Sequence, residues 1–229
     1  MRALILIPAA ALAAVGLASG CAPVPGRVAV TGDSTMFQAL YYSTSTVDDG
    51  WDHGQLDTAN DPATPNDDMV QLGAEAEDLH PDVQRAVDDP NRSPEVLVVA
   101  VGHNDAATGG TGVGGQPRDG WTDTDALQVL SLLAAPEDGV TCTVAVLPGY
   151  RGSDPVHAAG IAAMRTFVAE SVALNPDSMV AVDWQPVIDT HPEYLASDGV
   201  HLSGAAEASN AFVELIHTGV DRCFGVLGG

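Results

Sequence analysis

The sequence contains no lysine, and its few basic residues are arginines. The 229 residues include 8 Lys+Arg against 31 Asp+Glu, which gives a formal net charge of −23 at pH 7. Proteins that bind nucleic acids need cations to pair with the phosphates, so this balance argues against a nucleic-acid partner. The acidic residues are spread along the chain rather than gathered in one tail, and we expect most of them to be solvated at the surface.

Cysteine is also scarce, and the chain has only Cys21, Cys142 and Cys223. There is no CxxC pair, which disfavours a zinc site. In an exported chain, Cys142 and Cys223 form an even pair that predicts a disulfide, with two buried free thiols as the alternative.

Patterns typical of metal binding are lacking as well. The acidic stretch 43–68 misses the spacing of an EF-hand, and we interpret it as a long surface loop or a partly ordered insertion. Six histidines show no paired spacing of metal ligands: His53, His80, His103, His157, His191 and His217. We therefore expect neither a metal nor an organic cofactor.

The long apolar run of the sequence lies at its N-terminus, where "ALILIPAAALAAVGLASGC" follows the first two residues. This run is interrupted by Pro8 and Gly16 and is short for a membrane span. One positive charge, an apolar stretch and small residues before Cys21 predict a secretory signal over residues 1–20, with an uncleaved anchor as the alternative.

The segment "LASGC" resembles a bacterial lipoprotein processing box. The resemblance implies cleavage before Cys21 and lipidation of its sulfur, which would make the protein an exported, outward-facing lipoprotein anchored in the membrane. Ala18 stands where that pattern usually has leucine, so ordinary secretion stays open. After the signal we expect a single domain that covers residues 21–229.

Strand patterns and helix patterns alternate five times along the rest of the chain. This alternation predicts an α/β fold, a three-layer α/β/α sandwich around a five-stranded parallel sheet of the flavodoxin-like type. The expected strands are residues 27–30, 69–72, 95–102, 140–148 and 178–184. The expected helices are residues 34–42, the segment from Gly73 to about 87, and residues 123–135, 154–174 and about 203–218.

The longest connections after the acidic stretch are a glycine-rich segment, 103–120, and the segment 185–202, and both are predicted as loops. In open parallel sheets, binding sites gather at the carboxyl ends of the strands. Polar motifs in such positions are therefore the first candidates for a functional site.

Three motifs stand at predicted strand ends or just before the last helix. They are "GDST" at residues 32–35, "GHND" at 102–105 and "DGVH" at 198–201. In order and placement, they resemble the blocks of the GDSL or SGNH hydrolase family, with Thr35 where the name-giving leucine would stand. Gly73, between a short strand and a helix, resembles the glycine block, and the resemblance covers residues 32–201.

The chemistry of these residues agrees with the resemblance. A serine hydroxyl such as that of Ser34 is a poor nucleophile until a base removes its proton, and His201 is the natural base. Asp198 can accept the other ring N–H of His201 and fix its tautomer. Taken alone, Ser34 could also be a helix cap, Asn104 and its neighbour a plain turn, and His201 a surface residue.

The resemblance further implies an oxyanion hole. Its donors would be the backbone N–H of Ser34, the backbone N–H of Gly73 and the side-chain amide of Asn104. We expect Asp33 and Asp105 to brace the turns rather than to react.

Several other residues lie in loops that could border the site. His103 and His191 could stand at its edge. Trp121 and Trp184 could wall the cleft, with ordinary core packing as the alternative.

These observations predict a serine esterase that forms an acyl-enzyme on Ser34, with His201 as base and Asp198 as its partner. By resemblance, the substrate would be a carboxylic ester with a short acyl group or an O-acyl group of a carbohydrate. The alternatives are an O-acyltransferase that acts on a cell-surface glycan, and a surface-binding lipoprotein without catalytic activity. The predicted partners are a small-molecule or glycan ester, and the membrane only through the lipid anchor at Cys21.

Overall fold

The computed structural model describes residues 28–44, 51–52, 69–89, 94–111, 117–134 and 139–227. The predicted signal, the lipidation site Cys21 and most of the acidic stretch 43–68 lie outside the described residues. In the described part of the chain, no helix has the length and apolar character needed to cross a membrane.

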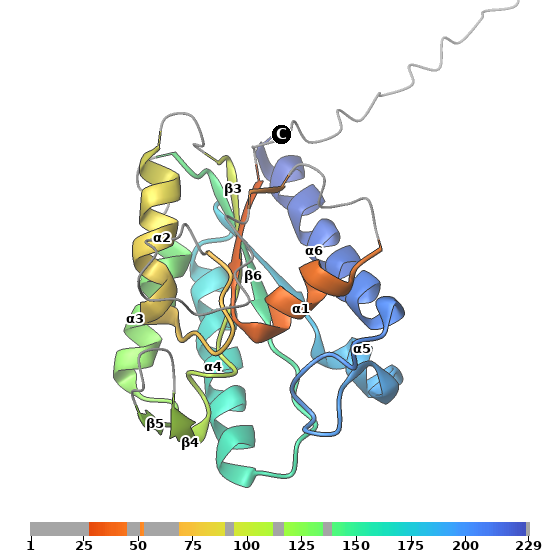
Figure 1. The fold of residues 1–229 in the computed structure, drawn as a ribbon. Helices are drawn as coiled ribbons and strands as arrows, with labels where there is room; N and C mark the ends of the chain where they lie inside the picture. Colours follow the sequence, from red (N-terminus) through yellow and green to blue (C-terminus); the bar gives the residue numbers. More distant parts are fainter. Residues whose placement is uncertain are drawn as a thin grey trace, which may run out of the picture.

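A five-stranded parallel sheet forms the centre of the molecule, in the order β2-β1-β3-β6-β7 (Figure 1). The strands are β1 (Val28–Gly32), β2 (Trp51–Asp52), β3 (Val96–Ala100), β6 (Cys142–Leu147) and β7 (Met179–Asp183). Every residue of β1, β3 and β6 is buried, which explains why these segments are continuous apolar runs rather than alternating ones. The predicted fold class is confirmed.

Helices cover both faces of the sheet. The helices α1 (Ser34–Tyr42), α5 (Gln185–Thr190) and α6 (Ala206–Leu227) lie on one face, and α2 (Ala76–Asp88), α3 (Asp123–Ala134) and α4 (Pro155–Leu174) lie on the other (Figure 1). Alternate residues of each strand point to opposite faces of the sheet and so belong to two different cores. Val28 and Val30 pack with Phe212 of α6, whereas Ala29 packs with Leu79 of α2.

The fifth strand is not the one that the sequence predicts. Residues 69–72 form only an isolated parallel bridge between Val70 and Gly32, and the edge strand is β2, inside the predicted loop 43–68. Both segments pair with the same edge of β1, β2 at its start and Val70 at its end. Trp51 anchors β2 by packing against the ring of His217, at 4.6 Å between ring centroids.

Three other segments differ from the prediction. The segment 103–120 contains an antiparallel hairpin, β4 (Thr108–Thr111) and β5 (Pro117–Asp119), and the segment 185–202 contains α5 and a 3₁₀ helix, Pro192–Tyr194. The last helix, α6, starts at 206 rather than 203 and continues past 218. It continues because the apolar spacing does: Ile216, Val220 and Cys223 are all buried on its inner face.

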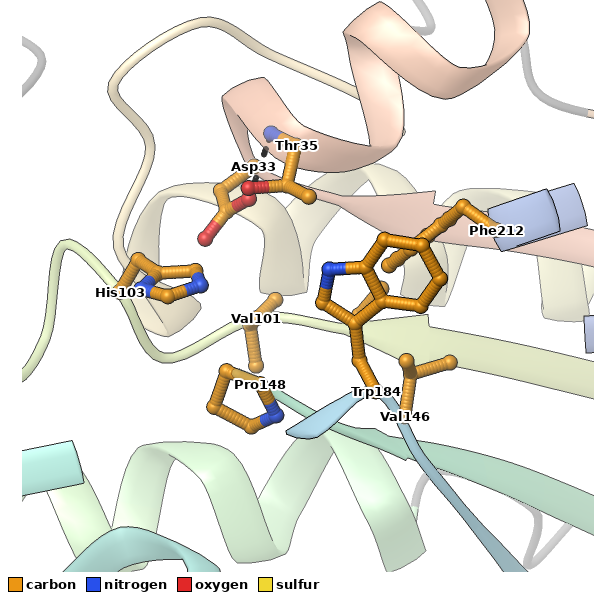
Figure 2. A pocket seen from close by; sticks show the side chains of 9 residues that line it. Asp33, Thr35, Val101, His103, Val146, Pro148, Trp184 and Phe212 are labelled. Carbon is orange, nitrogen blue, oxygen red and sulfur yellow. Dashed lines mark hydrogen bonds between the residues drawn. The ribbon is translucent and has the colours of Figure 1, made fainter. Parts of the chain in front are cut away.

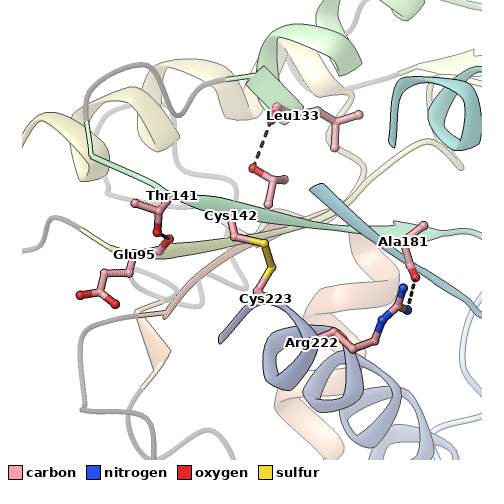
Figure 3. The surroundings of a disulfide bond; sticks show 8 residues. Glu95, Leu133, Thr141, Cys142, Ala181, Arg222 and Cys223 are labelled. Atoms are coloured by element: carbon pink, nitrogen blue, oxygen red, sulfur yellow. Dashed lines mark hydrogen bonds between the residues drawn. A yellow bond between two sulfur atoms is a disulfide. The ribbon is translucent and has the colours of Figure 1, made fainter. Parts of the chain in front are cut away.

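The predicted disulfide between Cys142 and Cys223 is present (Figure 3). It joins the first residue of β6 to the last turns of α6, across a sequence separation of 81 residues. The bond therefore ties the C-terminal helix to the amino end of a central strand.

Candidate active site

Ser34 is the first residue of α1 and directly follows the turn at the end of β1. The helix cap is Asp33, whose Oδ1 accepts a hydrogen bond of 2.9 Å from the backbone N–H of Thr35. Asp33 is itself held by its N–H, which donates to the carbonyl of Ala100 at the end of β3. The capping role is thus filled by the preceding residue, and the Ser34 hydroxyl is left for other contacts.

The structure brings Ser34, His201 and Asp198 into one hydrogen-bonded chain. The Ser34 Oγ lies 2.9 Å from Nε2 of His201, and Nδ1 of His201 lies 2.7 Å from Oδ2 of Asp198. With Asp198 ionised, Nδ1 carries the ring proton and donates a hydrogen bond to the carboxylate, so Nε2 is free to accept from the serine hydroxyl. The contact between Ser34 and His201 joins residues that are 167 positions apart in the sequence.

Asp198 also organises its own loop. Its Oδ1 accepts hydrogen bonds from the backbone N–H groups of Val200 and His201, at 2.9 and 3.0 Å. Partial burial raises the pKa of Asp198, but the hydrogen bonds from the His201 ring and from these N–H groups outweigh it and hold the pKa below its usual value. The carboxylate is therefore the stable form beside the imidazole.

Gly199 fixes where this loop lies, and sequence reasoning missed it. Its φ is +73°, and a Cβ at this position would lie 2.2 Å from the backbone nitrogen of Gly152. The Gly199 carbonyl accepts a hydrogen bond of 2.9 Å from the N–H of Arg151. The loop that carries His201 thus packs backbone to backbone against the segment after β6, which only glycine permits.

The predicted oxyanion segment is held from several sides. Arg118 of the β4–β5 hairpin donates a hydrogen bond of 2.9 Å from Nη2 to the carbonyl of Gly73, whose φ is +78°. Asn104 donates from Nδ2 to the carbonyl of Ala74 at 2.8 Å, and Oδ1 of Asp105 accepts from the N–H of Ala76 at 2.9 Å. Sequence reasoning missed Arg118, because it lies in a segment that was expected to be a loop.

Free donors remain in this region. In the described part of the chain, the backbone N–H groups of Ser34 and Gly73 donate to no protein acceptor. One amide hydrogen of Asn104 is bound to Ala74, and its second hydrogen is available.

Two buried carboxyl groups and a buried histidine lie beneath these loops. Burial raises the pKa of Asp33 to about 6 and that of Asp105 to about 7. Burial lowers the pKa of His103 to about 3, so this imidazole is neutral. As predicted, Asp33 and Asp105 brace turns, the first by capping α1 and the second by bonding the start of α2.

The remaining candidates divide into two groups. His103 and Trp184 line a small cavity behind the Ser34 turn, and Trp184 also packs against Phe212 in the core (Figure 2). His191 lies instead on the surface with Glu193, and Trp121 packs against Phe167. Among the described residues, no cluster of three or more His, Cys, Asp or Glu side chains could hold a metal ion.

Comparison with known proteins relates the chain to others through its fold. No protein-family model matches the sequence, and none of the curated proteins matches it either. Solved structures do match over most of the chain at low identity.

Three of these structures illustrate the likeness. The C-terminal catalytic domain of peptidoglycan O-acetyltransferase A (OatA) from Streptococcus pneumoniae, solved with a methylsulfonyl adduct, is 16% identical with a TM-score of 0.61, over 89% of this chain and 97% of that one. A GDSL-like lipase from Bacteroides thetaiotaomicron is 16% identical with a TM-score of 0.63, over 87% and 91%. The acetylxylan esterase Axe2 from Geobacillus stearothermophilus is 15% identical with a TM-score of 0.56, over 86% and 95%. The chain therefore has the fold of the GDSL/SGNH hydrolases.

Proposed function

We propose that the protein is a serine esterase that hydrolyses carboxylic esters through an acyl-enzyme on Ser34. The observation that carries this proposal is the hydrogen-bonded chain from the Ser34 hydroxyl through the His201 ring to the Asp198 carboxylate, at 2.9 and 2.7 Å. A hydroxyl aligned with a neutral imidazole, whose other nitrogen faces a carboxylate, is the arrangement that activates a serine.

In the acylation step, Oγ of Ser34 attacks the ester carbonyl carbon while its proton passes to Nε2 of His201. The tetrahedral intermediate then collapses, the bond between the carbonyl carbon and the alkoxy oxygen breaks, and His201 returns the proton to the leaving alcohol. Asp198 stabilises the imidazolium that exists between the two proton transfers.

In the deacylation step, a water molecule attacks the acyl carbon and gives its proton to Nε2 of His201. The carboxylic acid leaves as the bond to Oγ breaks, and the same proton restores the Ser34 hydroxyl. Water can reach this position because the His201 side chain is 38% exposed and the Asp198 side chain 49% exposed.

Both tetrahedral intermediates carry a negative oxygen, which fixed donors would stabilise. We assign this role to the N–H groups of Ser34 and Gly73 and to the free amide hydrogen of Asn104. The hydrogen bond from Asn104 to Ala74, next to Gly73, supports the assignment because it ties two of these donor segments together. Loss of one such donor costs about 3–4 kcal/mol of barrier in other enzymes.

For the substrate we propose an ester with a short acyl group, including acyl groups carried by carbohydrates. The exposed His201 and Asp198 leave the leaving-group side open to a large alcohol such as a sugar. Two of the proteins with this fold are named as acetyl xylan esterases.

An O-acyltransferase is the second candidate, because a protein with this fold is a peptidoglycan O-acetyltransferase domain. It would use the same residues and pass the acyl group to a glycan hydroxyl instead of water. Product analysis separates the two: with an acetyl ester and an excess of a soluble glycan acceptor, an esterase yields acetate, whereas a transferase yields the acetylated glycan.

The location of the protein is part of the proposal. The N-terminal pattern favours export and lipidation at Cys21, with simple secretion as the alternative. Incorporation of labelled palmitate that is lost in Cys21→Ala would support the lipoprotein, and equal labelling of both forms would contradict it.

The test of the enzyme is labelling with a fluorophosphonate probe, followed by hydrolysis of 4-nitrophenyl esters of increasing chain length. We expect stoichiometric labelling of Ser34, fastest turnover on the acetyl ester, and loss of both in Ser34→Ala with an unchanged melting temperature. Ser131→Ala is the matched control. Ser131 lies in α3, and its hydroxyl donates to the carbonyl of Gln128 in the same helix. An active Ser34→Ala protein would refute the proposal, and absence of labelling in the wild type would favour the non-catalytic binding lipoprotein.

A further inference from the structure

A small cavity lies behind the Ser34 turn, where the carboxyl ends of β1, β3, β6 and β7 converge (Figure 2). Its volume is about 10 Å³, which is the space that one water molecule needs. Apolar residues close most of its wall, and the polar part consists of Asp33, Thr35, His103 and Trp184.

All four polar side chains bring unpaired atoms to this cavity. Oδ2 of Asp33, Oγ1 of Thr35, both ring nitrogens of His103 and Nε1 of Trp184 are buried and form no hydrogen bond of good geometry among the described residues. The Thr35 hydroxyl and the backbone N–H of His103 lie near the Asp33 carboxylate and lower its pKa, but neither is well enough aligned to satisfy Oδ2. Each of these residues is at most 4% exposed. Figure 2 shows the carboxylate, the indole nitrogen and the imidazole directed toward the same space. Buried polar atoms without a partner are rare and unfavourable, so a shared partner is expected here.

The chemistry of the four groups defines that partner. The Asp33 carboxylate accepts, the Trp184 indole N–H donates, the Thr35 hydroxyl does either, and the neutral His103 ring has one donor and one acceptor. One water molecule has two donors and two acceptors and can bond one atom of each residue, including one of the two His103 ring nitrogens, and the volume admits nothing larger than water.

We propose that this cavity is a binding site for one ordered water molecule that bridges Asp33, Thr35, His103 and Trp184. The water joins the turn that carries Ser34 to the loop that carries Asn104, and joins both to the end of β7. It is a structural support beneath the site, and its existence does not depend on the proposed esterase activity.

Thr35 makes this site particular to the chain. The GDSL block has leucine at this position, which offers no hydroxyl and is larger than threonine. The alternative is a direct hydrogen bond between Asp33 and His103. Rotation of the Asp33 carboxylate or of the His103 ring could form this bond without water. The two arrangements differ in whether the Trp184 N–H touches a water molecule.

The test is nuclear magnetic resonance on the full protein with ¹⁵N-labelled tryptophan. The Trp184 indole resonance is assigned with Trp184→Phe. We expect a cross-peak between this N–H and a water molecule bound for longer than nanoseconds, whereas the partly buried Trp121 serves as the internal reference. Absence of the Trp184 cross-peak would overturn the proposal.

Substitutions at Thr35 locate the water. Thr35→Val keeps the side-chain shape but removes the hydroxyl, and we expect about tenfold shorter water residence from the loss of one hydrogen bond; Thr35→Ser, which keeps the hydroxyl, is the matched control. Thr35→Leu should abolish the cross-peak by filling the cavity. A residence time unchanged in Thr35→Val, or a persistent cross-peak in folded Thr35→Leu, would overturn the assignment.

Discussion

The guanidinium of Arg118 holds the carbonyl of Gly73 through a hydrogen bond of 2.9 Å. The bond connects the β4–β5 hairpin to the segment just before α2. In this segment, Gly73 supplies a proposed oxyanion donor. The same guanidinium faces the carboxylate of Glu75, with 3.5 Å between Nε and Oε1. We therefore expect Arg118 to act on the proposed site by holding the backbone at Gly73.

For Arg118→Met we expect kcat to fall about tenfold with KM little changed, because a small displacement of a donor weakens transition-state stabilisation more than substrate binding. Arg118→Lys should recover part of the loss. The measurement is steady-state hydrolysis of a short-chain chromogenic ester, alongside the melting temperature.

Glu75→Gln is the matched control, since it removes the ion pair but keeps Arg118 on the Gly73 carbonyl. We expect it to retain nearly full kcat. An equal fall of kcat in Glu75→Gln and Arg118→Met would assign the effect to the ion pair and contradict the role of the Gly73 contact.

Asp198→Asn tests the carboxylate beside His201. The amide oxygen can still accept from the N–H groups of Val200 and His201, but the amide nitrogen then faces Nδ1 and favours the ring tautomer that cannot accept from Ser34. We expect kcat to fall on the order of 10³-fold with the fold intact. Asp189→Asn, at an exposed aspartate that pairs with Arg151, is the control, and comparable activity of the two variants would exclude Asp198 from the proposed mechanism.

Gly199→Ala tests the contact that places the His201 loop. The new Cβ would collide with the backbone of Arg151 and Gly152, so the loop must shift and the reach between His201 and Ser34 is lost. We expect kcat to fall about 10²-fold. Gly204→Ala has a similar φ of +77° but no atom within 4 Å of its Cβ, and it should stay active; equal losses in both variants would show that backbone strain, not the collision, is responsible.

The raised pKa of Asp105 should make the free energy of unfolding depend on pH. Its pKa is about 7 in the folded protein and close to 3.8 in the unfolded chain, so between these values the folded state keeps a proton that the unfolded state releases. The contribution of this group to the free energy of unfolding is therefore largest at low pH and is lost as the pH rises toward 7. Between pH 5 and 8 the loss is roughly 2–3 kcal/mol.

Asp105→Asn removes this titration, so its stability relative to the wild type should rise by about that amount from pH 5 to pH 8, measured by chemical denaturation. The opposite effect of His103, whose lowered pKa costs stability on acidification, is common to both proteins and cancels in the difference. A difference for Asp105→Asn that stays flat with pH would contradict its burial as a proton-binding group.

Short sequence motifs and apolar runs predicted the architecture. They also predicted that Ser34, Asp198 and His201 lie together. The continuous apolar runs of β3 and β6 are typical of strands buried on both faces, and the motifs follow such strands or precede a helix. Parallel strands bring their carboxyl ends to one edge, so residues that are distant in sequence were expected to be neighbours.

Contacts that depend on packing between distant backbones were not predictable in this way. The two-residue strand β2 is too short to leave a pattern, and Trp51 packs against His217, which is distant in the sequence. Arg118 belongs to a hairpin with no alternating apolar residues, so nothing in the sequence linked it to Gly73. Glycine is required at position 199 because the backbone of Gly152, in another loop, lies against it.

The disulfide and the cavity behind Ser34 lie at opposite ends of β6, since Cys142 begins the strand and Pro148, which lines the cavity, directly follows it. Reduction would free the tail of α6 and enlarge the set of conformations open to the denatured chain, without disturbing the loops that carry the reacting groups. The redox state of the surroundings would accordingly govern how long each molecule survives heat or proteolysis, and not how fast an intact molecule turns over.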